Sequence, residues 1–225
     1  MKKAILITAL SLCMSSAFAA ETAVMKVQGT LTNSACTPEL SNGGVVDYGM
    51  VRLGELSATD TNQLGQKDFS LTINCVTPTK IAFSVYDDRT GTAPNITVKN
   101  GTNASRDVSD TDKLFGVNKT AGGVNIGNYS MFAKEDNISV DGAAGRIIYS
   151  ADQGATWEAV GVGGIMYNRA PRIVSLAEVG KTTPLAFSTA VIPMRTALAV
   201  QSTDTLAITD DTAIDGQATF TLIYL

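Results

Sequence analysis

The chain has 225 residues, of which 44% are hydrophobic and 17% are charged. This composition excludes disordered and fibrous proteins, and it suffices to bury the core of one domain. The chain has no histidine, which excludes the Ser-His-Asp triad, the Cys-His pair and ordinary zinc catalysis. Its 17 basic residues are outnumbered by 21 acidic ones and form no basic run, so no nucleic-acid partner is expected.

The first residues are typical of a signal peptide for export. A basic start, Met1–Lys3, precedes the apolar run Ala4–Cys13, and Ala17–Ala19 supplies a cleavage site of small residues. We therefore expect residues 1–19 to be removed. The alternatives are an uncleaved N-terminal anchor and a lipoprotein modified at Cys13.

Removal of the signal peptide leaves Cys36 and Cys75 as the two cysteines of the exported chain. Exported proteins meet an oxidising compartment, so this pair is expected to form one disulfide. Two unpaired buried thiols are the alternative. Two cysteines without histidine cannot complete a four-ligand zinc site.

Short strand-like runs separated by turn-forming residues follow along the rest of the chain. The expected strands are Met25–Thr32, Phe69–Asn74, Lys80–Tyr86, Ile96–Lys99, Leu114–Val117, Tyr129–Ala133, Gly145–Tyr149, Trp157–Val160, Leu185–Met194, Leu206–Ile208 and Ala218–Leu225. No helical period persists over more than two turns, and no repeat of fixed length is visible. This pattern indicates an all-β sandwich or barrel, with a loop-rich insertion at about 87–144.

Both ends of the exported chain alternate apolar and polar residues. The residues that share a face are Ala23, Met25 and Val27 near the amino end, and Phe220, Leu222 and Tyr224 at the carboxyl end. An apolar strand that runs to the last residue can pair with another chain. The alternative is an ordinary edge strand that is completed within its own sheet.

Several segments resemble the pilins, which are the subunits of chaperone–usher fimbriae. The run Gly29–Cys36 resembles the first pilin strand, Phe69–Cys75 resembles the strand with the second cysteine, and Ala218–Leu225 resembles the carboxyl-terminal strand with its penultimate tyrosine. Between the cysteines, Asp47–Gly49 and Leu53–Gly54 resemble a further pilin segment.

The resemblance implies one domain at residues 29–225, an incomplete immunoglobulin-like β-sandwich with one disulfide. In pilins a periplasmic chaperone, and then the next subunit, supplies the missing strand by β-augmentation. The residues that the resemblance assigns to chaperone recognition are Phe220, Leu222 and Tyr224. Residues 20–28 become the donor extension, and its inward face is Ala23, Met25 and Val27.

The expected function is therefore structural, as a subunit of a bacterial surface fimbria. Its partners are then a periplasmic chaperone, an outer-membrane usher and neighbouring subunits, and its location is the cell surface. The extension at residues 20–28 is short, which favours a minor or adaptor subunit. The alternative is an adhesin subunit that binds a host glycan or receptor through the loops at 87–144 or through Trp157.

One motif, Ser150–Trp157, resembles the Asp-box of sialidases. Its mechanics are those of a hairpin turn, in which Asp152 binds backbone amides, Gly154 takes a positive φ and Trp157 packs under the turn. We expect this structural role and no enzyme, although a hydrolase built on the motif is a third hypothesis. No cofactor or metal is expected. The carboxylates at Asp107, Asp110, Asp112, Asp210 and Asp211 are interpreted as solvated turn residues rather than calcium ligands.

Overall fold

The computed structural model describes residues 25, 35–161, 163–169 and 171–225. The described residues from Ala35 onward belong to one compact unit. Its elements in chain order are β1 (Cys36–Leu40), η1 (Ser41–Gly44), η2 (Leu53–Glu55), β2 (Asn62–Asp87), η3 (Thr111–Lys113), β3 (Phe115–Gly116), β4 (Gly127–Ala133), η4 (Glu135–Asn137), β5 (Ser139–Val140), β6 (Ala143–Ser150), β7 (Glu158–Ala159), β8 (Ile173–Glu178), β9 (Ala186–Val200), α1 (Thr203–Leu206) and β10 (Ala218–Tyr224). Within this described part, no helix has the length and apolar character needed to cross a membrane.

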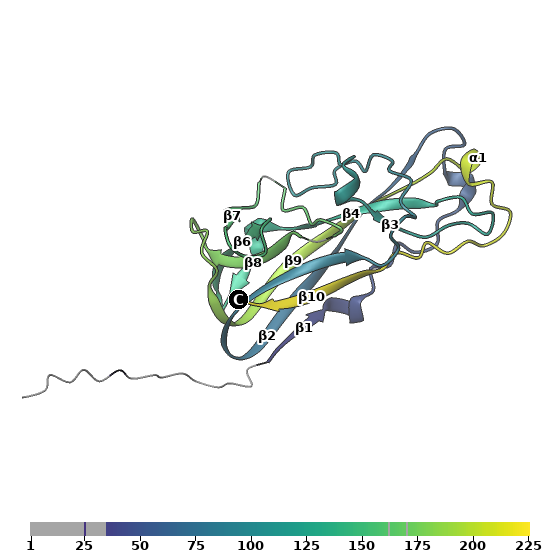
Figure 1. Ribbon diagram of the computed structural model, residues 1–225. Helices are drawn as coiled ribbons and strands as arrows, with labels where there is room; N and C mark the ends of the chain where they lie inside the picture. Colours follow the sequence, from purple (N-terminus) through teal and green to yellow (C-terminus); the bar gives the residue numbers. More distant parts are fainter. Residues whose placement is uncertain (1–24, 26–34, 162, 170) are drawn as a thin grey trace, which may run out of the picture. The chain divides into compact units, whose positions relative to one another are not determined.

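The long strand β2 belongs to both layers of the fold (Figure 1). Its first part pairs with β1 and β9, and its last part pairs with β8 and β10. The register against β9 shifts between Asn74 and Thr79. The strands expected from the sequence, Phe69–Asn74 and Lys80–Tyr86, lie on the two sides of this point, and Pro78 lies between them. A proline is tolerated where a strand leaves its regular ladder, so the strand continues through the shift.

Two antiparallel layers result from this pairing. The first has the order β1–β2–β9–β4–β3, with β5 also beside β9, and the second has the order β10–β2–β8–β6–β7. Large side chains between the layers are almost fully buried, among them Phe83, Phe187, Leu71, Ile147 and Ile192. The predicted all-β sandwich is confirmed, as is its single disulfide.

Two predictions about local structure need correction. The range of the loop-rich insertion, about 87–144, is too wide, because β4 is buried along its whole length and pairs with β9 over seven residues. Only the stretch before β4 is loop-rich, with η3, β3 and isolated bridges such as Val98–Val108. The strand predicted at Leu206–Ile208 is wrong, since Leu206 ends the short helix α1. The side chain of Ser202 caps that helix by accepting a hydrogen bond from the Thr205 amide.

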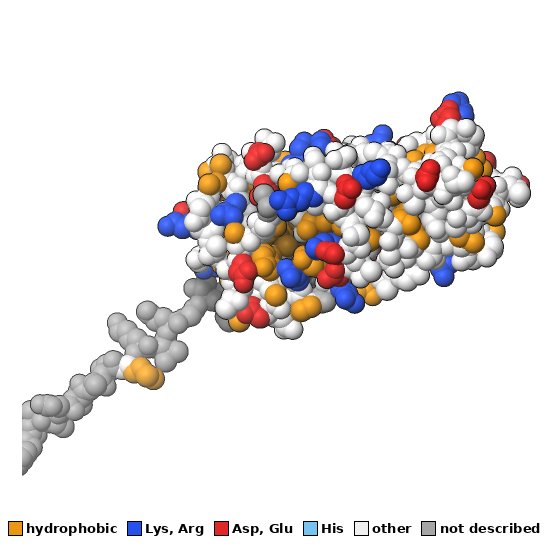
Figure 2. Space-filling model, turned by 90° about the horizontal axis from the view of Figure 1, so that it is seen from above, with side chains coloured by type: hydrophobic (Ala, Val, Ile, Leu, Met, Phe, Trp, Pro, Cys, Tyr) orange, Lys and Arg blue, Asp and Glu red, His pale blue; other side chains and the backbone are white. Residues whose placement is uncertain are grey.

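Charged side chains are spread over the surface. Acidic and basic groups are interspersed on the face in Figure 2. Three ion pairs join residues far apart in the sequence: Arg195 and Lys134 both pair with Asp68, and Arg89 pairs with Asp215. The exposed pairs contribute little to stability, so the core and the disulfide dominate.

Candidate functional site

The predicted disulfide joins the first strand to the second. Cys36 and Cys75 are direct cross-strand partners in the register of β1 and β2, and their sulfur atoms are 2.02 Å apart. The bond therefore fixes the start of β1 to the middle of β2, where β2 passes from one layer to the other. One margin of the sandwich is held covalently as a result.

Beside this disulfide, β1 and β10 are edge strands of different layers. Within the described part of the chain, each of them pairs only with β2, and the two run along the same margin of the sandwich (Figure 1). One polar contact joins their ends, because the Cys36 amide donates a hydrogen bond of 2.8 Å to the Tyr224 hydroxyl. Among the residues that the structure describes, no ladder of backbone hydrogen bonds closes the margin between them.

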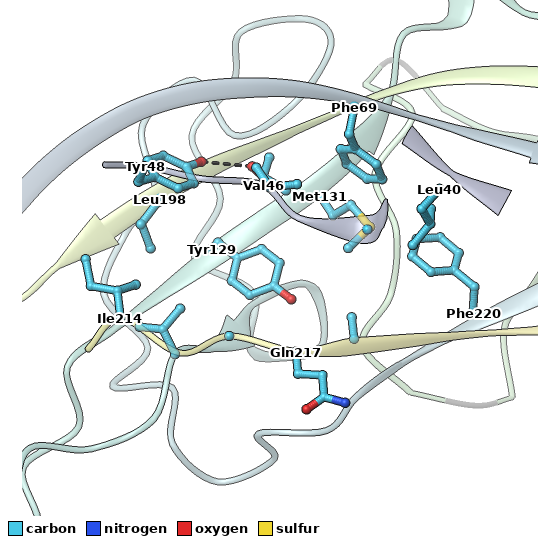
Figure 3. A pocket seen from close by; sticks show the side chains of 15 residues that line it. Leu40, Val46, Tyr48, Phe69, Tyr129, Met131, Leu198, Ile214, Gln217 and Phe220 are labelled. Carbon is cyan, nitrogen blue, oxygen red and sulfur yellow. Dashed lines mark hydrogen bonds between the residues drawn. The ribbon is translucent and has the colours of Figure 1, made fainter. Parts of the chain in front are cut away.

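An apolar groove opens between these two edges and reaches into the core. Its narrow part is a cavity of about 220 Å³. In Figure 3, Leu40 of β1 and Phe220 of β10 lie next to each other at one end of this cavity, and Met131 and Tyr129 of β4 line it farther along. Phe69 of β2 completes the lining beside Met131. The lining residues are thus side chains of the sandwich core that remain accessible from one side.

One pair of hydroxyl groups lies among these apolar side chains. The hydroxyls of Tyr48 and Thr196 are 2.8 Å apart and share a hydrogen bond (Figure 3). Burial raises the pKa of Tyr48 to about 12, because the phenolate would lose its hydration, and the bond to Thr196 offsets only part of this rise. Tyr48 is therefore neutral throughout the physiological range, and the groove carries no charge at this point.

Beyond Tyr48 the groove widens into a cavity of about 1150 Å³ between residues 44–56 and 206–216. Both flanks are extended but unpaired: within the described residues, the backbone of 46–51 and of 208–214 pairs with no other strand. The second flank is held from outside by Arg89, whose guanidinium donates to the Asp215 carboxylate at 2.6 Å and to the Asp215 carbonyl at 3.1 Å. Both flanks therefore offer backbone N–H and C=O groups that could pair with another strand.

Two of the three carboxyl-terminal residues lie where the alternation predicts. Phe220 and Leu222 are half-buried and pack against the core, and the Phe220 ring lies 6.1 Å from the ring of Phe83. Tyr224 differs from them, because its side chain is 52% exposed and its hydroxyl extends to β1. The role of these residues in chaperone recognition stays a prediction.

Most of the predicted donor extension, residues 20–28, lies outside the described residues, Ala23 and Val27 included. Met25 is described, and its side chain is 84% exposed. The assignment of these residues to a donor strand also stays a prediction.

The Asp-box motif forms the hairpin turn between β6 and β7. Asp152 accepts hydrogen bonds from the Thr156 amide at 2.9 Å, the Thr156 hydroxyl at 2.6 Å and the Ser150 hydroxyl at 2.6 Å. Gly154 has φ +97°, and the Trp157 indole donates to its carbonyl at 3.1 Å. These hydrogen bonds lower the pKa of Asp152 to about 2. The predicted turn geometry is confirmed.

Two surface aromatics near this hairpin already have a partner. The Arg172 guanidinium lies 4.0 Å from the ring centre of Tyr167 and 4.7 Å from that of Tyr149. The Tyr149 hydroxyl also donates to Glu158 at 2.7 Å. The structure therefore brings Tyr149, Tyr167 and Arg172 together, while Arg195 pairs elsewhere with Asp68.

The carboxylates considered as calcium ligands make separate contacts with nearby residues. Asp107 accepts a hydrogen bond from the Asn100 amide, and Asp110 pairs with Lys113. Among the residues that the structure describes, no group of three or more His, Cys, Asp or Glu side chains is placed to hold a metal ion.

Sequence reasoning missed most residues that line the groove. Tyr129 and Met131 alternate within a strand that the sequence does predict, but nothing in the pattern shows that this strand lies under an opening. Val46 and Tyr48 alternate as well, yet they belong to a segment without strand pairing. For this flank, the alternation of residues 44–48 is the signal that the sequence offers.

Comparison with known proteins gives three matches. A model of the family described as "Protein of unknown function (DUF1120)" matches residues 25–130, which include both disulfide cysteines. The chain is 30% identical over 225 positions to "Uncharacterized protein YhcF" of Escherichia coli strain K12, and the match covers 93% of each chain. It is 29% identical over 222 positions to "Protein GltF" of the same organism, with 89% of this chain and 87% of that protein covered.

Proposed function

This chain belongs to the same family as YhcF of Escherichia coli, and we propose that it is a structural subunit of an exported surface fimbria, completed by a strand from another chain. One observation carries the proposal: β1 and β10 leave an apolar groove open between two unpaired edges. A single extended segment could pair with both edges and cover the exposed part of the core. The pilin-like cysteine and carboxyl-terminal segments agree with this interpretation.

The energetics favour such a completion. Several side chains that pack on the core are only half-buried, and they gather along the groove: Leu40, Val46, Tyr48, Leu56, Ile208, Ala218 and Phe220. Burial of apolar surface stabilises by about 25 cal/mol per Å², and an incoming strand also pairs free backbone groups. Without a partner, the same edges and side chains are a site for aggregation.

The remaining partners follow from the route of assembly. The signal-peptide pattern supports export, and an aggregation-prone subunit needs a chaperone that lends a strand before assembly. We therefore include a periplasmic chaperone, an outer-membrane usher and neighbouring fimbrial subunits in the proposal. Glycan binding is less favoured, because the Trp157 indole closes its own turn and Tyr149 and Tyr167 are stacked on Arg172.

Hydrogen exchange on the purified chain from residue 20 onward tests this function. We expect amides of β1 and β10 to exchange far faster than those of β9, since edges without a partner open locally. A peptide that copies residues 22–32 should slow their exchange and turn aggregates into monomers, whereas a peptide with Met25 and Val27 changed to Asp should not. A lone chain that is monomeric, heat-resistant and fully protected at both edges would contradict the proposal.

A further inference from the structure

We infer that the wide end of the groove selects a basic residue on the strand that fills it. The partner is then an extended polypeptide with alternating apolar side chains and with Lys or Arg at the end that reaches this part of the groove. The inference rests on the proposed function, because it names the chemistry of the strand that the groove accepts.

The charged side chains that line the wide end all have one sign; Arg52, in the same flank, is not part of the lining and pairs with Glu55. Its lining contains four carboxylates and neither Lys nor Arg: Asp47, Asp210, Asp211 and Asp215. Asp215 is neutralised by Arg89. In the described part of the chain, the other three form no ion pair, although Asp47 accepts from the Gly49 amide at 2.7 Å and Asp210 accepts from Thr209 at 3.3 Å.

The narrow part of the groove differs in chemistry from the wide end. Its lining has no charged side chain, and its polar groups include the paired hydroxyls of Tyr48 and Thr196. Apolar side chains of an incoming strand therefore fit at the narrow part, and a cation fits at the wide end. Recognition of both on one strand fixes its direction and register, because reversing the strand would place the cation against apolar side chains.

A polypeptide accounts for this surface better than a metal ion. The three unpaired carboxylates belong to two separate flanks, and they form no group that could hold a metal. Both flanks carry free backbone groups, which an extended peptide can use and an ion cannot. A cleft with carboxylates of one sign also raises the local concentration of cationic groups.

The test uses peptides that copy residues 22–32, either unextended or with Lys-Lys or Glu-Glu added at either end. Binding to the chain from residue 20 onward is measured by fluorescence anisotropy in 50 and 500 mM NaCl. We expect Lys-Lys at one of the two ends to tighten binding about fivefold at low salt, and Glu-Glu at that end to weaken it. High salt should remove most of the difference, because the carboxylates are exposed and screened.

Two double variants assign the effect to the groove. Asp210→Asn with Asp211→Asn should abolish the preference for Lys-Lys, whereas Asp136→Asn with Glu178→Gln removes two exposed carboxylates elsewhere and should preserve it. Equal affinity for all extended peptides would overturn this inference and leave the proposed function intact. Failure of every peptide to bind, the unextended one included, would contradict the proposed function itself.

Discussion

The sandwich has two kinds of margin. At the outer ends of its layers, β3 and β7 are edge strands of two residues each. The edges at the groove, β1 and β10, have five and seven residues. Short edges are a common protection against pairing with other chains. The longer edge β10 alternates apolar side chains and lacks this protection, whereas β1 is longer too but carries Pro38 and Glu39. The fold therefore protects two margins against unwanted pairing and leaves one margin available.

The margins also differ in the contacts that hold their strands in place. In the turn before β7, the Ser150 hydroxyl and the Thr156 amide both donate hydrogen bonds to Asp152. In β3, the Gly116 amide donates to the buried Asp87 carboxylate at 3.0 Å. At the groove, the fastening consists of the disulfide, the bond from Cys36 to Tyr224, and the Arg89–Asp215 pair. These contacts hold the rims in place without filling the space between them.

Loss of the disulfide should have the largest effect on the open margin. The double variant Cys36→Ser with Cys75→Ser is expected to lose roughly 4 kcal/mol of the free energy of unfolding on the chain-entropy model. Urea denaturation with and without a reducing agent measures this loss. The reduced native chain should match the double variant, and a loss below about 1 kcal/mol would show that β1 is held mainly by packing.

Truncation of one phenylalanine in each region should separate the core from the groove. Phe187→Ala removes a ring with 0% exposure, and its expected cost is about 3–5 kcal/mol. Phe220→Ala removes a half-buried ring at the groove, so its cost in the lone chain should be smaller, about 1–2 kcal/mol.

For the affinity of a strand peptide, the order of the two phenylalanine variants should be reversed. A peptide that copies residues 22–32 stands for the strand of another copy. If this peptide fills the groove, Phe220→Ala should weaken its binding. Phe187→Ala should affect it much less, provided that the variant folds. Equal effects of the two variants on peptide affinity would erase the distinction between the two regions.

The sequence predicts the fold at those places where one local signal decides the structure. A strand-like run between turn-forming residues identifies β4, alternation identifies β10, the cysteines identify the disulfide, and Asp152 with Gly154 identifies the turn. The pairing of strands is decided by long-range packing, so neither the continuity of β2 nor the role of β8 could be predicted. Ile173–Glu178 is buried at five of six positions and therefore shows no alternation.

The groove itself is only partly visible in the sequence. The carboxyl-terminal alternation indicates an edge, and Phe220 and Leu222 do point toward the core. The carboxylates at Asp210 and Asp211 lie in a turn-like segment, where such residues are usually solvated. Only the folded chain brings them opposite Asp47, because the two flanks are more than 150 residues apart in the sequence.

A smaller effect is expected from the single hydroxyl pair in the groove. Tyr48→Phe leaves the buried Thr196 hydroxyl without its partner, so we expect a loss of about 1 kcal/mol in the free energy of unfolding. Tyr149→Phe, which removes an exposed hydrogen bond to Glu158, is the control and should change stability by less. A spectroscopic titration adds a second measurement, since Tyr48 should ionise only near pH 12.

The smallest effect is a pH response confined to the protected margin. The folded-state pKa of Asp152 is about 2, below the ordinary value of about 3.9. Its stabilisation of the turn is therefore fully present above about pH 4 and is lost as the pH falls toward 2. The Thr156 amide, which donates to this carboxylate, should report the change in an NMR titration. A midpoint near 4 would mean that these hydrogen bonds do not favour the charged form, and Asp152→Asn should remove the titration altogether.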